Sequence, residues 1–276
     1  MSISLLHVEK VVTNHLGQKL IVGKDTSGGF KRHGCFGWQE LFYIERVLSK
    51  IKLPIALDVG ANIGNHAVVM AHYCSHVHAF EPQIALGIRL TDNIAINKLA
   101  NVTCHPFGLS DRNGRAILHV APGVGAGAAT FVSDLARTNS RAVEVGLRNG
   151  DEVVAMLGLN RVDLIKVDVE GYEARALSGL RDTILRCRPI VFLEWNNAVT
   201  RQEFLDYGLF ENLFSGWLTY SILNNHAKSI ASGWRRVLKK VLTRRQAILG
   251  KFVSTCSYGS IVICPPEKAD LLLATR

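Results

Sequence analysis

The pattern of apolar and polar positions changes near residue 55. Residues 1–53 alternate short apolar runs with polar turns, and helical spacing occurs there only over residues 38–50. From residue 55 onward, continuous runs of Val, Ile and Leu alternate with segments whose apolar residues recur at helical spacing. Such runs are typical of strands buried on both faces of a parallel sheet. We therefore expect a doubly wound α/β fold.

The repeating unit of this fold is a strand, a turn and a helix. Strands are expected over residues 55–59, 76–80, 101–109, 114–120, 161–169 and 189–195, with a closing pair over 217–223 and 259–266. Helices are expected over residues 65–73, 85–99, 150–159 and 172–185. We divide the chain into an N-terminal cap, residues 1–53, and a main domain, residues 54–276, with a basic insertion at about 225–256.

The first strand ends in the turn "DVGANIG", residues 58–64. Glycines at 60 and 64 let the backbone turn sharply and approach a ligand, and Asn62 tolerates positive φ. In a parallel sheet this loop lies at the switch point where ligands bind. Glu81 closes the second strand 21 residues after Gly60, where an acid accepts hydrogen bonds from ribose hydroxyls. The pattern predicts a ligand that carries a ribose.

Two cofactors carry such a ribose. A nicotinamide dinucleotide needs its pyrophosphate held by G-x-G-x-x-G, and positions 60, 62 and 64 hold Gly, Asn and Gly instead. Asp58 would repel a pyrophosphate but suits the ammonium of a methionine moiety. S-adenosylmethionine is therefore the better-matched ligand.

A second acidic cluster stands in "DLIKVDVEGYE", residues 163–173. Lys166, Asp168 and Glu170 occur at period two in a strand otherwise made of Leu, Ile and Val. Charges in such a strand are costly unless they are paired or used. These charges have two interpretations. In the first, Lys166 forms an ion pair with one of the carboxylates and the role is structural. In the second, Asp168 and Glu170 lie across the switch point from the first turn, beside the group that accepts the methyl.

Five segments, "DVGANIGNH", "AFEP", "GLSDRNG", "VDLIKVDVEGYEARALSGL" and "PIVFLEWNN", together resemble the FkbM family of S-adenosylmethionine-dependent methyltransferases from about residue 55 to 196. The resemblance implies a Rossmann-like, seven-stranded methyltransferase sheet with helices on both faces. It also implies methyl transfer to hydroxyl groups, often of sugars or polyketides, with S-adenosylhomocysteine as the product.

The resemblance also implies roles for individual residues. The cofactor would be bound at Asp58, Gly60, Ala61, Asn62 and Gly64 (methionine part), at Glu81 and Pro82 (ribose), and at Gly108 and Leu109 (adenine). Asp168 and Glu170 would line the acceptor site. Because a sugar hydroxyl is a poor nucleophile, we predict Asp168 as its general base and Glu170 as the second candidate. Glu194 could join Asp168 in holding a Mg²⁺ that lowers the hydroxyl pKa.

The net charge of +9 is concentrated in one region, since residues 212–266 contain no Asp or Glu. Residues 234–251 place apolar residues at helical spacing opposite basic ones. This predicts a helix that either packs on the domain with a solvated basic face or touches an anionic membrane or an acidic acceptor, such as a lipid-linked glycan. With no signal peptide, no apolar run of roughly 18 residues and scattered cysteines, we expect a cytoplasmic protein.

Other functions stay open at this point. The basic patch raises ribose 2′-O-methylation of RNA, although no RNA-binding module is recognisable and "DVEGY" stands where base N-methylation would require an N/D-P-P-Y motif. Nucleic acid is therefore not the expected partner. A cofactor-binding protein without catalysis is a further alternative, against which the intact Asp168 and Glu170 argue. Nicotinamide-dependent oxidoreduction ranks last.

Overall fold

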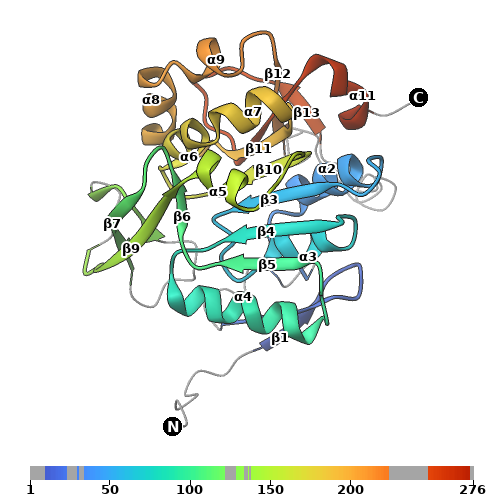
Figure 1. Ribbon diagram of the computed structural model, residues 1–276, viewed down its shortest axis with the longest axis vertical. Coiled ribbons are helices and arrows are strands. Elements are labelled where there is room, and N and C mark those ends of the chain that lie inside the picture. The colour runs from blue at the N-terminus through green and yellow to red at the C-terminus, as the bar shows by residue number, and fades with distance from the viewer. Residues whose placement is uncertain are drawn as a thin grey trace, which may run out of the picture.

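A sheet of eight strands forms the centre of the protein (Figure 1). The computed structural model describes residues 10–23, 30, 34–121, 129–133, 136, 138–223 and 248–273. The strand order is β13-β12-β14-β11-β10-β3-β4-β5. The bounds are β3 (Ile55–Val59), β4 (His76–Phe80), β5 (Val102–His105), β10 (Leu164–Val167), β11 (Ile190–Glu194), β12 (Leu218–Leu223), β13 (Ile248–Lys251) and β14 (Ser260–Cys264). Neighbours from β11 to β5 pair in parallel, and β14 runs antiparallel between β11 and β12.

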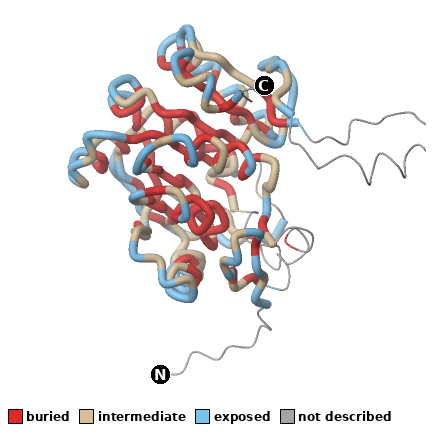
Figure 2. The backbone as a smooth tube through the Cα atoms, turned by 90° about the vertical axis from the view of Figure 1, so that its right-hand side faces the viewer, coloured by how far each residue is buried: buried red, intermediate tan, exposed pale blue. Residues whose placement is uncertain are grey.

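Helices cover both faces of this sheet. One face carries α2 (Trp38–Leu48), α3 (Asn65–Ala71), α4 (Ile84–Ile96) and α11 (Ala269–Leu272). The other carries α5 (Gly150–Met156), α6 (Glu173–Gly179), α7 (Arg181–Cys187), α8 (Ala198–Asp206) and α9 (Leu209–Asn212). Alternate strand residues serve the two faces, so Ala56 packs with the first set and Leu57 with the second. Both are wholly buried, and the tube in Figure 2 is red, the colour of buried residues, through the middle of the molecule.

The expected fold class is confirmed, with one additional edge strand among the described residues. Strand β13 pairs with β12, so that Leu249 lies opposite Ile222 and Ile248 opposite Leu223. The apolar residues Ile248 and Leu249 therefore belong to a strand, and the expected basic helix cannot extend through them. The rest of that segment, residues 234–247, lies outside the described residues.

A second, four-stranded sheet was not predicted. It has the order β6-β9-β7-β8 and contains β6 (Gly108–Ser110), β7 (Gly114–Val120), β8 (Ala129–Thr130) and β9 (Arg141–Asn149). The single strand expected over residues 101–109 is divided between the two sheets, since β5 ends at His105 and β6 begins at Gly108. In Figure 1, β7 and β9 lie beyond the ends at which the parallel strands finish.

The N-terminal part begins with a hairpin of β1 (Lys10–Thr13) and β2 (Lys19–Val22). The side chains of Asn93 on α4 and of Asn97, the residue that caps its C-terminus, bind the backbone of β2. The last elements in the described part of the chain are a short 3-10 helix, η2 (Pro266–Lys268), and α11. Among the described residues, no helix has the length and apolar character that crossing a bilayer requires.

Candidate active site

The carboxyl ends of β3, β10 and β11 meet at one edge of the main sheet. Lys166 on β10 lies between Asp58 on β3 and Phe192 on β11. Asp168 follows β10 directly, and Glu194 is the last residue of β11. The parallel topology therefore gathers at one edge acids that are far apart in the sequence, as expected for a switch-point site.

The turn after β3 has the backbone that its sequence predicts. Gly60, Asn62 and Gly64 all adopt positive φ, at 82°, 55° and 90°. At Gly60 the reason is also steric, because a Cβ there would stand 2.0 Å from the carbonyl oxygen of Asp168. At Gly64 a Cβ would meet the side chain of Leu90 at 2.6 Å. The glycine turn after β3, residues 60–64, and the turn that begins at Asp168 are thus in direct backbone contact.

Glu81 lies across this turn at the end of β4. Its buried carboxylate accepts hydrogen bonds from the backbone N–H of Asn62 (2.8 Å) and of Gln83 (2.9 Å). Burial raises the pKa of Glu81 to about 7. Each oxygen keeps a lone pair for a further donor, which fits a ribose with two hydroxyls.

The other predicted cofactor residues are distributed around this carboxylate. Pro82 follows Glu81 and packs near Gly108, where an added Cβ would stand 3.7 Å from Pro82. Ala61 and Leu109 are buried, 4% and 2% exposed, and Leu109 belongs to the core beneath β6. The structure brings these residues together at one edge, while their contacts with a cofactor stay predictions.

Asp58 lies deeper than the sequence suggests. Its side chain is 0% exposed, and neither carboxylate oxygen has a hydrogen-bond partner. The Nζ of Lys166 stands 3.8 Å from Asp58 and 3.1 Å from Asp168. Burial raises the pKa of Asp58. Burial also disfavours the charged form of Lys166, but the carboxylates of Asp168 and Asp58 raise the pKa of Lys166 above its ordinary value. Contact between Asp58 and a cofactor would require this enclosed pair to move.

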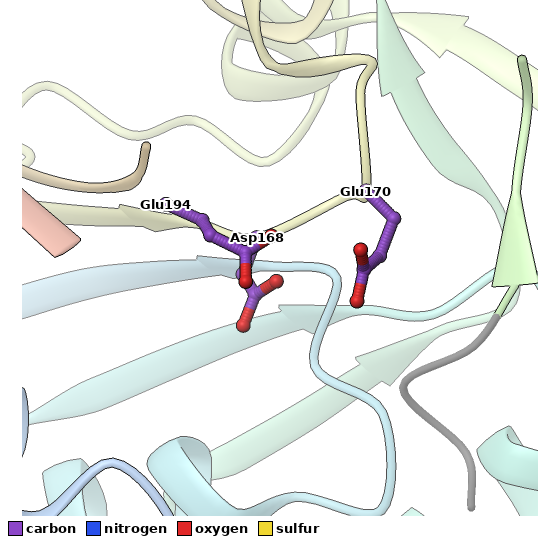
Figure 3. A group of neighbouring side chains, drawn as sticks. All are labelled: Asp168, Glu170 and Glu194. Atoms are coloured by element: carbon purple, nitrogen blue, oxygen red, sulfur yellow. The ribbon is translucent and has the colours of Figure 1, made fainter. Parts of the chain in front are cut away.

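Asp168, Glu170 and Glu194 form an acidic cluster, and one oxygen from each lies within 4.8 Å of the others (Figure 3). Burial would raise the pKa of Asp168, but Lys166 and then His66 hold it below its ordinary value. Burial, and next the charge of Asp168, raise the pKa of Glu194 to about 11. Asp168 therefore favours its ionised form and Glu194 its protonated form, which could donate a hydrogen bond to Asp168.

Glu173 organises the turn after Asp168, a role that the sequence analysis missed. Its wholly buried carboxylate accepts hydrogen bonds from the N–H groups of Val169 and Gly171 and from the hydroxyl of Thr200. The turn needs such support because Glu170 adopts a positive φ of 53°, which is costly for a residue with a side chain. The available signal was a third acid in "DVEGYE", just before a helix.

The order of the sheet, with β14 reversed between β11 and β12, and the two turns at its edge define a Rossmann-like methyltransferase. More narrowly, the chain belongs to the methyltransferase FkbM domain family, whose model matches residues 58–226. The resemblance seen in the sequence is thereby confirmed.

The chain is similar in sequence to three named proteins. AMB antimetabolite synthetase AmbE of Pseudomonas aeruginosa is 30% identical over 195 residues, which cover 56% of this chain and 9% of that protein. Hexuronic acid methyltransferase AglP of Haloferax volcanii is 32% identical over 129 residues, which cover 46% and 50%. 2-O-methyltransferase NoeI of Sinorhizobium fredii is 25% identical over 158 residues, which cover 52% and 64%. The chain thus spans less than two thirds of each relative.

Among solved structures, the crystal structure of methyltransferase FkbM from Methylobacillus flagellatus is similar, with a TM-score of 0.47 and 15% identity over 76% of this chain and 43% of that one.

Proposed function

We propose that this protein transfers a methyl group from S-adenosylmethionine to a hydroxyl oxygen of a sugar or glycan, and that it releases S-adenosylhomocysteine. A polyketide-like hydroxyl is the second acceptor class. The observation that carries the proposal is the direct contact between the glycine turn and the turn that holds the ionised Asp168. The names of AglP and NoeI, a hexuronic acid methyltransferase and a 2-O-methyltransferase, support a sugar acceptor.

The donor would lie over the glycine turn, with its ribose hydroxyls on Glu81. Both oxygens of Glu81 are already oriented by backbone N–H groups, so the carboxylate needs no rearrangement to accept the ribose. The donor supplies a methyl group on a sulfonium, the leaving group of the reaction. Asn62, whose N–H holds Glu81 in place, couples the turn to the ribose site.

Asp168 is the proposed base. The acceptor oxygen attacks the methyl carbon in line, the electron pair of the carbon–sulfur bond stays on sulfur, and the hydroxyl proton moves to Asp168. Lys166 favours the ionised form of the Asp168 carboxylate, and a protonated Glu194 would orient it by donating a hydrogen bond. Much of the rate would come from holding the acceptor oxygen about 3–3.5 Å from the methyl carbon. Glu170 is the second candidate base.

The acceptor would approach from the second sheet. A cavity of about 320 Å³ lies beside the turn that holds Asp168 and Glu170. Its lining includes Tyr172, Arg112, Arg115 and Arg175. The hydroxyl of Thr130 on β8 donates to the carbonyl of Glu170 at 2.7 Å, which ties this side of the cavity to the turn. Arg115 already pairs with Glu144 at 2.6 Å, and Arg175 pairs with Glu203, which also lines the cavity, at 3.3 Å. Guanidinium groups recognise carboxylates and phosphates, so an acidic sugar is the favoured acceptor if its acid group exchanges with these partners.

A methyl-transfer assay with isotopically labelled S-adenosylmethionine tests the proposal. We expect label in uronic-acid disaccharides ahead of neutral ones, and we expect it to survive mild alkali. A methyl ether resists alkali, whereas a methyl ester on the uronic carboxyl is hydrolysed. Alkali-labile label would overturn the hydroxyl assignment, and transfer only to RNA would overturn the assignment of a sugar or glycan acceptor.

Magnesium stays a prediction of the sequence, and Glu194→Gln tests it. Asp168, Glu170 and Glu194 would be the ligands, and the ion would lower the pKa of the acceptor hydroxyl. If Glu194 instead acts as a protonated donor to Asp168, a glutamine can replace it, because its amide also donates a hydrogen bond. We expect kcat within about threefold of wild type, since the net worth of one such bond is small.

The matched control is Glu211→Gln, a replacement at an exposed acid on α9. A kcat loss of more than about a hundredfold in Glu194→Gln, together with wild-type activity that EDTA removes and MgCl₂ restores, would assign the cluster to a metal.

A further inference from the structure

A buried glutamate, Glu40, and a buried histidine, His66, lie beside the acidic cluster. Glu40 lies outside the residues that the family model matches. Glu40 stands in the first turn of α2 and His66 in the first turn of α3. They are 7% and 6% exposed, and Oε2 of Glu40 lies 3.5 Å from Nε2 of His66. The contact lacks hydrogen-bond geometry, so His66 Nε2 is buried and has no hydrogen-bond partner.

The neighbouring hydrogen bonds fix the state of this histidine. Asn65 accepts from the N–H of Phe36 with Oδ1 and donates to the carbonyl of Phe36 with Nδ2, which sets the orientation of its amide. The same Nδ2 faces His66 Nδ1 at 3.4 Å. Since the amide nitrogen can only donate, Nδ1 is the acceptor and Nε2 carries the hydrogen. His66 therefore presents a buried donor that lacks an acceptor.

The pair lies next to the residues assigned to the donor. His66 is the second residue after Gly64, the last glycine of the turn after β3. Glu40 acts on Lys166 after Asp168 and Asp58, and raises its pKa against the effect of burial. Gly37, with φ of 63°, passes close by, since a Cβ there would stand 3.5 Å from His66 Nε2.

We propose that Glu40 and His66 bind the amino-acid end of the methyl donor, which rests on the donor proposed above. Nε2–H of His66 would donate to the α-carboxylate, and Glu40 would accept from the α-ammonium. An α-amino acid presents these two opposite charges on neighbouring atoms, as the pair requires. The role falls to Glu40 because Asp58 is enclosed behind Lys166.

A buried donor without an acceptor is costly, and a bound carboxylate would remove that cost. The N-terminal segment would then complete the donor site, although the family match begins only at residue 58.

The test compares two ligands by calorimetry on the full chain. S-adenosylhomocysteine carries the amino-acid end, whereas 5′-methylthioadenosine has the same adenosine and sulfur without it. We expect Glu40→Gln and His66→Phe each to weaken binding of S-adenosylhomocysteine by about tenfold or more, the usual worth of a hydrogen bond to a charged group. Binding of 5′-methylthioadenosine should stay within about twofold of wild type.

The matched control is His15→Gln, which removes another contact to α2, the exposed 2.9 Å pair of His15 with Glu45. It should leave both ligands unaffected. Equal weakening of both ligands in Glu40→Gln and His66→Phe would show a purely structural pair and overturn the inference, as would no change for either. If one variant does not fold, the other decides the question. Wild-type protein that binds neither ligand would instead overturn the proposed donor.

Discussion

Replacing Asp168 with asparagine is expected to lower kcat by at least about a hundredfold, because it removes the group that takes the proton of the acceptor hydroxyl. Binding of S-adenosylhomocysteine should stay within about twofold of wild type, since asparagine keeps the size of the side chain. Lys166 keeps Asp58 as its second carboxylate in this variant, so folding should survive. Steady-state kinetics together with calorimetry measure the two quantities.

A matched control for this variant is Asp206→Asn at an exposed acid on α8, which should retain wild-type kcat. Wild-type turnover in Asp168→Asn would remove Asp168 from the mechanism. Parallel losses of turnover and of product binding would indicate a role in holding the donor.

Replacing Lys166 with methionine is expected to lower the free energy of unfolding by about 3–5 kcal/mol, the cost of leaving a buried carboxylate without its partner. Asp58 is 0% exposed, and its oxygens have no hydrogen bond to fall back on. Urea denaturation measures the change. The control Lys251→Met, at an exposed lysine on β13, should remain within about 0.5 kcal/mol of wild type.

A double variant identifies the source of that loss. If the unpaired Asp58 charge causes it, adding Asp58→Asn to Lys166→Met should recover a measurable part of the stability. A loss below about 1 kcal/mol in the single variant would mean that water or a proton already compensates Asp58.

The sequence predicted the main sheet well because its strands are continuous apolar runs that the core requires on both faces. It missed β9 and the second sheet, since residues 141–149 hold three charged residues and a glycine in a largely exposed strand and form no continuous apolar run. It also predicted one helix over residues 172–185, whereas the structure has two. There, a Cβ at Gly179 would meet the backbone of Ser110 at 1.8 Å, a tertiary contact that no local pattern contains.

The sequence predicted those site residues that are acids placed directly after a strand. Glu81 and Asp168 follow strands directly, and the rule for parallel sheets places strand ends together. Glu40 and Glu173 could not be found in that way. Glu40 looks like an ordinary first-turn acid of an amphipathic helix, and its neighbour His66 is 26 residues later in the chain. Only tertiary packing shows that these residues adjoin the cluster.

The contact between Gly60 and the carbonyl of Asp168 affects how loss-of-function variants at the glycine turn can be interpreted. A side chain at position 60 would push apart the two loops, so donor pocket and base would be displaced in one event. An inactive Gly60→Ala protein would therefore say nothing about which of the two was lost. Kinetic dissection of the reaction is better pursued with the isosteric replacements Glu81→Gln and Asp168→Asn, which add no side-chain volume between the loops.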